Sequence, residues 1–287
     1  MKSVQIDGKP VGDGHPYYFI AEIGINHNGS VEIAKQLINV AAAAGCKAVK
    51  FQKRTVDVVY SPEELAKPRE NPFGLTNGDL KRGLEFGQTE YATIDEYCRT
   101  IGISWFASCW DELSVDFIAQ FNVPCYKIAS ASLTDDALLK YTRSTGKPII
   151  LSTGMSSLEE VDHAVEILGT EDLVLMHTVS TYPAKYSDLN LRVIETLKRR
   201  YNVPVGYSGH ETGIASSVVA AAMGACILER HITLDRAMWG SDQAASLEPN
   251  GINKLVRDVL LVEQALGSPE KDCLKVEEPV KAKLRRK

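Results

Sequence analysis

Charged, hydroxyl and imidazole side chains recur at the ends of short apolar runs in this chain. Lys50 and Lys127 each lie inside such a run, where an unpaired ammonium group is costly to bury and needs an anionic partner. That partner could be a carboxylate of the protein, with Glu22 and Glu229 as candidates, or the phosphate or carboxylate of a ligand. Hydroxyl groups at similar positions would add hydrogen bonds to a bound anion. They belong to Ser130, Ser152 and Ser208.

Two histidines, His210 and His231, lie at the ends of the last two apolar runs. Two imidazoles, an oxygen ligand such as Glu22 and open water positions suit a divalent first-row metal ion. An open site of this kind favours manganese over the closed, four-ligand site of a structural zinc ion. Magnesium, cobalt and zinc stay as alternatives. His27 and His177 are open to two interpretations, as site residues or as core histidines.

The elements that must position these residues follow from the hydrophobic pattern. Near-continuous apolar runs are typical of parallel strands covered on both faces. There are eight, at 19–25, 47–52, 103–108, 125–130, 148–153, 173–178, 203–208 and 226–231. Amphipathic segments between them predict helices that end at a glycine or asparagine. These ends are Gly45, Gly102, Asn122, Gly146, Gly169, Asn202, Gly224 and Gly267. The pattern predicts an α/β fold, a single (β/α)8 barrel, with chemistry at the carboxyl ends of its strands.

Some segments fall outside this repeat. An expected hairpin around Asp7 and Gly8 could plug the bottom of the barrel. The long connection at 53–90 is a candidate substrate lid, with a helix predicted at 79–86, whereas the last residues have lost periodicity. The chain is therefore divided into a hairpin at 1–18, a barrel at 19–276 and a basic tail at 277–287.

Composition narrows the function. The net charge of -5 argues against nucleic acid or an acidic membrane surface as the main partner, but allows a small anionic substrate. No apolar run reaches the roughly 18 residues that a membrane span needs. The start of the chain lacks the regions of a signal peptide, so we expect a cytoplasmic protein. Six cysteines without a CxxC pair predict reduced, unpaired thiols.

Seven ordered stretches resemble the sialic acid synthases, also called N-acetylneuraminate synthases. They are AEIGINHNG (21–29), VKFQK (49–53), YKIAS (126–130), ILSTGM (150–155), GYSGHETG (206–213), LERHITLD (228–235) and GSDQAASLEP (240–249). These stretches span nearly the whole chain. The residues of the last motifs are most similar to the branch that uses a sugar 6-phosphate. The resemblance implies that phosphoenolpyruvate condenses with the open-chain aldehyde of N-acetylmannosamine or a related, 6-phosphorylated or free, aldose. The products would be a nine-carbon 3-deoxy-2-keto acid and phosphate.

The resemblance also implies roles for individual residues. His210 and His231 would hold the metal, a Lewis acid on the aldehyde oxygen, with Glu22 beside the reacting centre. Tyr182 and Asp242 would contact the sugar, although by position alone Asp242 could be a turn former in a glycine-containing loop. The residues expected at phosphoenolpyruvate are Lys50, Gln52, Lys127, Ser130, Ser152, Ser180 and Ser208.

The chain departs from the family pattern mainly around the acceptor sugar. Ser132 stands where the family often has an acidic residue, and Ser180 stands where an asparagine is usual. Family members often continue into an antifreeze-like domain whose arginine reaches over the partner's active site, and this sequence stops near that linker. We expect a separate capping protein, an acceptor held without that arginine, or a low-activity relative. A homodimer is expected by analogy.

Other functions stay open at this point. The enzyme could make another 3-deoxy-2-ulosonic acid, such as legionaminic, pseudaminic or deaminated sialic acid, or an octulosonate. A metal-dependent sugar isomerase or aldolase on the same barrel would not consume phosphoenolpyruvate. A non-catalytic sugar-binding barrel would be expected to lose site residues, yet both lysines and both metal-type histidines are present.

Overall fold

Eight parallel strands close into a barrel in the computed structural model, which describes residues 3–286. The strand order around the barrel is β10-β11-β12-β3-β4-β7-β8-β9, and β9 pairs with β10 to complete it. Their bounds are β3 (Tyr18–Gly24), β4 (Ala48–Lys53), β7 (Ser104–Cys109), β8 (Tyr126–Ile128), β9 (Ile149–Ser152), β10 (Leu173–Thr178), β11 (Val205–Gly209) and β12 (Ile227–His231). All eight predicted strands and the predicted barrel are confirmed.

The strand register brings the polar residues to one level of the barrel. Glu22 of β3 stands opposite His231 of β12 on one side and Lys50 of β4 on the other. Ser108 of β7 stands opposite Lys127 of β8. Because all eight strands run the same way, these residues share the carboxyl-terminal mouth of the barrel.

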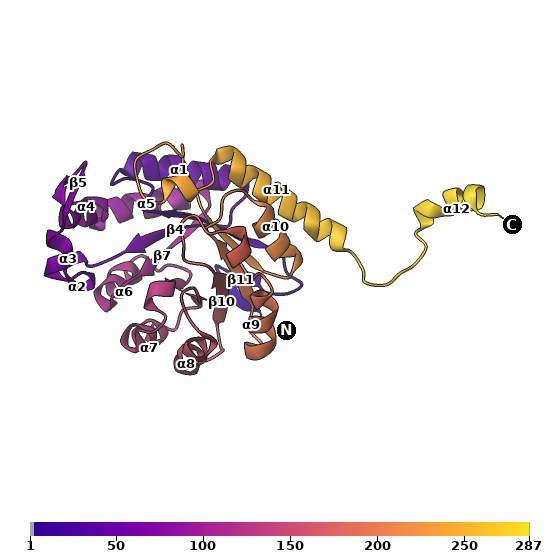
Figure 1. The fold of residues 1–287 in the computed structure, drawn as a ribbon, viewed down its shortest axis with the longest axis horizontal. Coiled ribbons are helices and arrows are strands. Elements are labelled where there is room, and N and C mark those ends of the chain that lie inside the picture. The colour runs from indigo at the N-terminus through magenta and orange to yellow at the C-terminus, as the bar shows by residue number, and fades with distance from the viewer. Residues whose placement is uncertain (1–2, 287) are drawn as a thin grey trace.

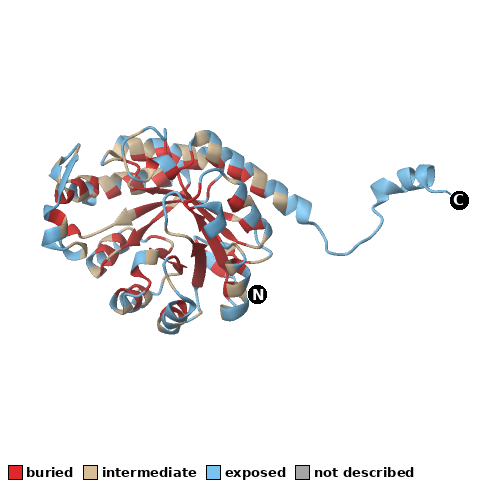
Figure 2. Ribbon diagram, in the orientation of Figure 1, coloured by how far each residue is buried: buried red, intermediate tan, exposed pale blue. Residues whose placement is uncertain are grey.

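Helices surround the barrel and bury one face against it, so that buried residues concentrate on the strands and exposure increases outward (Figure 2). They are α1 (Val31–Ala44), α5 (Gln88–Ile101), α6 (Glu112–Ala119), α7 (Asp136–Ser144), α8 (Leu158–Leu168), α9 (Val193–Tyr201), α10 (Ala215–Ala222) and α11 (Pro249–Leu266). Every predicted helix-ending glycine or asparagine has a positive φ, from 49° at Asn122 to 91° at Gly224. Of two overlapping capping boxes in the sequence, Ser157 with Glu160 is the one that forms.

The N-terminal hairpin lies at the opposite end of the barrel from the polar mouth. Strands β1 (Val4–Ile6) and β2 (Lys9–Val11) are antiparallel. Their residues Val4, Ile6 and Val11 are buried in the main core. The Ser104 hydroxyl, at the start of β7, donates a 2.5 Å hydrogen bond to the Asp7 carboxylate in the hairpin turn. The hairpin therefore covers the amino-terminal ends of strands, as the sequence predicted.

The long connection after β4 is more structured than the sequence indicated. It contains α2 (Val56–Val59), α3 (Pro62–Ala66), a hairpin of β5 (Pro68–Asn71) and β6 (Gly74–Thr76), and α4 (Asn77–Leu84). The predicted helix at 79–86 is α4, which begins two residues earlier at a Thr76–Asp79 capping box and ends at Leu84. We call residues 54–87 the insertion.

The C-terminal segment corrects one expectation. Residues from 277 onward were expected to lack regular structure, but α12 (Glu278–Leu284) follows a 3₁₀ turn, η4 (Lys275–Glu277). Figure 1 shows α12 separated from the barrel by an extended stretch, and its residues are exposed. Other 3₁₀ turns are η1 (Ser130–Ser132), η2 (Tyr186–Asp188) and η3 (Gln243–Ala245). Within residues 3–286, no helix is both long and apolar enough to cross a membrane.

Candidate active site

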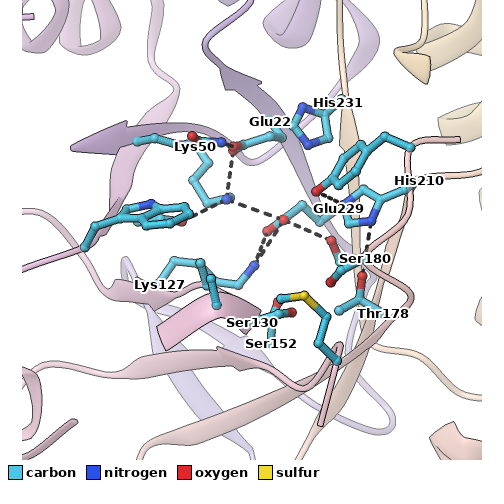
Figure 3. A pocket seen from close by; sticks show the side chains of 18 residues that line it. Glu22, Lys50, Lys127, Ser130, Ser152, Thr178, Ser180, His210, Glu229 and His231 are labelled. Carbon is cyan, nitrogen blue, oxygen red and sulfur yellow. Dashed lines mark hydrogen bonds and ion pairs between the residues drawn. The ribbon is translucent and has the colours of Figure 1, made fainter. Parts of the chain in front are cut away.

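A cavity of about 230 Å³ opens at the carboxyl-terminal mouth of the barrel (Figure 3). It is lined by most of the residues that the sequence singled out: Glu22, Lys50, Gln52, Lys127, Ser130, Ser152, Ser180, Tyr182, Ser208, His210 and His231. Glu229, Ser108, Trp110, Thr178 and Met155 also contribute. Asp242 does not line this cavity, but its carboxylate lies 4.0 Å from Nδ1 of His231. We call this cavity the catalytic pocket.

Four buried charges form the floor of the catalytic pocket. Lys50 Nζ lies 2.9 Å from Glu22 and 3.5 Å from Glu229, and Lys127 Nζ lies 3.0 Å from both Glu229 oxygens. The carboxylate partners that the sequence allowed for the two lysines are therefore present. Both ammonium groups still face the cavity, so a bound anion could share them (Figure 3).

The two carboxylates in this cluster differ in how readily they hold a proton. Burial raises the pKa of Glu22, and the charge of Glu229 adds to the effect while Lys50 opposes it. Burial also acts to raise the pKa of Glu229, but Lys127 and Lys50 outweigh it and hold that pKa at about 2. Glu22 is thus the carboxyl that can take up a proton, which would leave the cluster positively charged and receptive to an anion.

Serine hydroxyl groups also line the catalytic pocket. The Gly154 backbone N–H donates a 3.0 Å hydrogen bond to Ser130 Oγ, and a side chain at Gly154 would clash with the hydroxyls of Ser130 and Ser180. Ser208 donates a 3.1 Å hydrogen bond to Glu229. Clustered hydroxyl donors beside two ammonium groups are suited to a phosphate or carboxylate.

Sequence reasoning placed Ser108 at a strand end but gave it no partner. Its hydroxyl accepts a 3.0 Å hydrogen bond from Lys50 Nζ and so helps to aim that ammonium group. The residue was visible as the polar end of the third apolar run, but its direction depends on the register between β7 and its neighbours.

His210 is held as a neutral imidazole. Its Nδ1 lies 2.7 Å from the Val179 carbonyl oxygen, which only accepts, so Nδ1 carries the proton and Nε2 keeps its lone pair. The Tyr182 hydroxyl lies 3.0 Å from Nε2 and donates to it. Burial, with the nearby His231 ring, lowers the pKa of His210 to about 4. Near neutral pH the lone pair of this nitrogen therefore accepts from Tyr182, and a metal ion would take the place of that hydroxyl.

His231 faces His210 across 5.6 Å between ring centroids. Its Nδ1 is buried and makes no hydrogen bond within residues 3–286. The Asp242 carboxylate lies 4.0 Å from this nitrogen. Burial is the main cause that lowers the pKa of His231. Two neutral imidazoles in one wall could supply two ligands to a metal ion and leave its other positions open to water or substrate.

The expected oxygen ligand does not join them. No group of three or more histidine, cysteine, aspartate or glutamate side chains is arranged to hold a metal between residues 3 and 286. The Glu22 oxygens instead lie 3.0 Å from Gln52 Nε2 and 2.9 Å from Lys50 Nζ. The geometry therefore does not support Glu22 as a third metal ligand, because its carboxylate contacts the side chains of Lys50 and Gln52 on β4.

A buried ion pair supports both histidines and was also missed. Glu211 and Arg230 directly adjoin His210 and His231 in the chain, and their side chains pair at 3.0 Å with almost no exposure. The Arg230 guanidinium also donates to the carbonyl oxygens of Glu211 and Gly213. This pair ties the end of β11 to the end of β12.

The two histidines left open by the sequence are structural. His27 stacks on Phe86 at 4.0 Å, and its Nδ1 accepts a 3.1 Å hydrogen bond from the Gly29 N–H. His177 Nε2 donates a 2.7 Å hydrogen bond to the Leu189 carbonyl. Neither ring lines the catalytic pocket.

Comparisons with known proteins agree with this arrangement. The N-acetylneuraminate-9-phosphate synthase of Mus musculus is 41% identical over 282 residues, which cover 96% of this chain and 79% of that protein. The N,N'-diacetyllegionaminic acid synthase of Legionella pneumophila is 36% identical, over 97% of this chain and 81% of that protein. A solved N-acetylneuraminic acid synthetase from Leptospira borgpetersenii, in complex with citrate, aligns with a TM-score of 0.87 at 31% identity, covering 100% of this chain and 98% of that chain.

The family assignment follows from the extent of these matches. The model of the NeuB family matches residues 37–271, which include seven of the eight barrel strands and both histidines of the catalytic pocket. By this match, and by relatives more than 30% identical over nearly its whole length, the chain belongs to the NeuB family.

Proposed function

We propose that this protein is a transferase that condenses phosphoenolpyruvate with N-acetylmannosamine, or its 6-phosphate, to give a sialic acid-type 3-deoxy-2-keto acid and phosphate. The observation that carries the proposal is the convergence of two buried lysines, four serine hydroxyls and two neutral imidazoles on one cavity. The names of the mouse and Leptospira relatives support a sialic acid as the product.

The lysine and serine side of the catalytic pocket is assigned to phosphoenolpyruvate. Lys50 and Lys127 neutralise its negative charge, while the hydroxyls of Ser130, Ser152, Ser180 and Ser208 and the amide of Gln52 donate hydrogen bonds. Glu22 and Glu229 hold both ammonium groups in place before the anion binds. The free-energy cost of desolvating and orienting these two cations is therefore met on folding rather than on binding.

The histidine side is assigned to the aldehyde. His210 and His231 would hold a divalent metal, for which manganese is our first choice, and a metal bound there would supply a Lewis acid for the carbonyl oxygen. The Tyr182 hydroxyl, which donates to His210 Nε2 in this structure, would be freed to contact the sugar. Asp242, behind His231, would contact the sugar from the loop after β12.

The bond changes balance without a redox step. The enol carbon of phosphoenolpyruvate bonds to the aldehyde carbon, and the carbonyl electron pair goes to oxygen, which becomes a hydroxyl by taking a proton. Water adds at the phosphate-bearing carbon and gives one proton to the new alkoxide. The bond from that carbon to the phosphate oxygen then breaks, and the hydroxyl left on the carbon passes its proton to the departing phosphate to leave a ketone. Glu22, whose pKa is raised by burial, is placed between the two halves of the pocket to carry a proton.

A second candidate is a synthase for legionaminic acid, which the 36% identity to the Legionella enzyme favours. It would use the same donor and differ only in the amino sugar. A homodimer, manganese as the metal and a cytoplasmic location stay predictions.

The test is phosphate release from phosphoenolpyruvate by the full chain, after chelator treatment and metal add-back. Mannosamine derivatives with and without a 6-phosphate are the acceptors, and a mannosamine-type sugar with two acetamido groups represents the second candidate. We expect release with a mannosamine acceptor and only after metal is restored. Sugar turnover without phosphate release would indicate an isomerase or aldolase instead.

The donor assignment makes a separate prediction for Lys50→Ala. Loss of this ammonium group should raise the KM for phosphoenolpyruvate by about tenfold or more, because a charge-assisted contact is lost, and should raise the KM for the sugar much less. Steady-state kinetics with each substrate varied in turn measure the two effects. The reverse pattern would mean that the two halves of the pocket are exchanged.

A further inference from the structure

A second cavity, of about 280 Å³, lies among loops that follow the carboxyl ends of barrel strands. Its lining comes from the loop after β3, from the insertion and from the loop after β12. Trp239, Gly240 and Ser241 line it, and the next residue, Asp242, places its carboxylate 4.0 Å from His231. The same loop therefore lines the second cavity and approaches His231.

The insertion closes over the second cavity. The Phe73 ring, at the tip of the β5–β6 hairpin, meets the Trp239 ring edge-on at 6.4 Å between centroids. The Asn28 side-chain amide, in the loop after β3, donates a 2.8 Å hydrogen bond to the Trp239 carbonyl. Three segments far apart in the sequence are thus joined around one space.

Two cations of the insertion, Arg69 and Lys81, line this space. Arg69 donates to the Asn77 side chain at 3.3 Å, and Lys81 Nζ lies 4.9 Å from the centre of the Tyr60 ring. Neither makes an ion pair with a carboxylate in the described part of the chain, although the exposed Glu70 also lines the cavity. Other cations of the insertion are paired, for example Lys67 with Glu64 and Arg82 with Asp57.

The electrostatic surroundings of Lys81 favour an anion there. Burial lowers the pKa of Lys81, and the positive charges of Arg54 and Arg69 lower it further. The carboxylates of Asp242 and Glu64 act in the opposite direction, and Asp242 belongs to the loop that approaches His231. Like charges gathered in a partly buried space are stabilised when an anion binds between them.

We propose that the second cavity binds the 6-phosphate of the acceptor sugar, with Arg69 and Lys81 as its cationic ligands. The inference rests on the proposed function, since the aldehyde end must reach the catalytic pocket. An open-chain hexosamine would then place C1 at His210 and His231 and pass the Asp242 loop toward its phosphate. Ser241 and Asn28 also line the cavity, where the Ser241 hydroxyl donates to the Asp242 carboxylate and the Asn28 amide donates to the Trp239 carbonyl.

The test compares N-acetylmannosamine with N-acetylmannosamine 6-phosphate, using full-length wild type, Lys81→Gln, Arg69→Gln and Lys81→Arg. The matched control is Lys67→Gln, which removes one charge from the same insertion but not from the second cavity. We expect wild type to prefer the phosphorylated sugar. In each glutamine variant, the KM for this sugar should rise at least about tenfold more than the KM for the free sugar. Lys81→Arg should restore much of the preference, and Lys67→Gln should behave as wild type.

Two results would overturn the inference while leaving the proposed function intact. One is a wild-type enzyme that uses the free sugar as well as the phosphorylated one. The other is a pair of glutamine variants whose KM values change equally for both sugars. Failure of wild type to release phosphate with either sugar would instead overturn the proposed function, and the inference with it. A thermal shift with N-acetylmannosamine 6-phosphate, reduced in both glutamine variants but not in Lys67→Gln, gives support independent of turnover.

Discussion

The two histidines of the catalytic pocket are held to different degrees. His210 is fixed through Val179 and Tyr182, whereas His231 has a buried Nδ1 with no hydrogen bond. This asymmetry suggests that His231 gains its missing partner only when a metal or substrate is bound.

His231→Ala should therefore abolish metal-dependent turnover while leaving the fold intact. We expect a loss of about a hundredfold or more, since a Lewis acid contributes several kcal/mol to the barrier. Phosphate release with restored metal measures the effect, and circular dichroism checks the fold. His163→Ala, which removes an exposed histidine paired with Asp136, is the control. Undiminished activity in His231→Ala would remove the Lewis-acid role.

His27 predicts a pH dependence of stability. Burial lowers its pKa to about 3, and its Nδ1 can accept from Gly29 only when the ring is neutral. Below the unfolded value of about 6.5, the unfolded chain binds a proton that the native state refuses, so the free energy of unfolding falls as pH drops toward 3. This residue should cost about 2 kcal/mol at pH 5 relative to pH 7.5.

Urea unfolding of wild type and His27→Gln at the two pH values isolates this contribution. The glutamine oxygen can still accept from Gly29 but does not titrate, so the variant should lose less stability on acidification. Equal losses in both proteins would assign the acid sensitivity to other groups.

At this scale, the sequence predicted which residues meet but not how they pair. Eleven of the predicted site residues line one cavity because strand ends in a barrel converge whatever their separation in sequence. Arg230 was overlooked because its partner Glu211 lies on the neighbouring strand end, and that contact depends on the path of the intervening chain. The second cavity escaped notice for the same reason, since its walls come from three loops.

Among the elements, predictability follows burial. The barrel strands and the glycine and asparagine helix ends were all found, because continuous apolar runs and left-handed caps leave a local pattern. The helix α12 was missed because it has no buried face and therefore no apolar stripe to detect. The β5–β6 hairpin is similarly short and mostly exposed.

The ion pair between the ends of β11 and β12 should act as a positioning device for the two histidines. Glu211→Gln leaves the buried Arg230 charge without its counter-ion, which should destabilise the protein by about 3–5 kcal/mol. It should also raise the metal concentration needed for half-maximal activity more than it raises the KM for phosphoenolpyruvate. Metal titration and denaturant unfolding measure the two effects.

A surface ion pair supplies the control for this prediction. Arg200→Gln breaks the exposed pair with Asp162 and should change neither quantity appreciably. If Glu211→Gln loses stability but keeps the wild-type metal requirement, the buried pair is purely structural.

At the scale of the whole molecule, stability and chemistry occupy opposite ends of the barrel. Ile6→Ala, in the N-terminal hairpin, should cost about 2–5 kcal/mol because Ile6 is fully buried. The KM values should stay unchanged, since the catalytic pocket lies at the other mouth. Val58→Ala, at an exposed position, is the control. A KM that rises together with the loss of stability would show that the two ends are coupled.

The pairing of β12 with β3 has a consequence for biosynthesis. Glu22 and His231 face each other across this seam, although they are among the earliest and latest site residues to be translated. Nascent chains on the ribosome therefore cannot assemble the catalytic pocket until β12 has emerged. Turnover begins only when the barrel can close, so incomplete chains are inactive and cannot consume substrate.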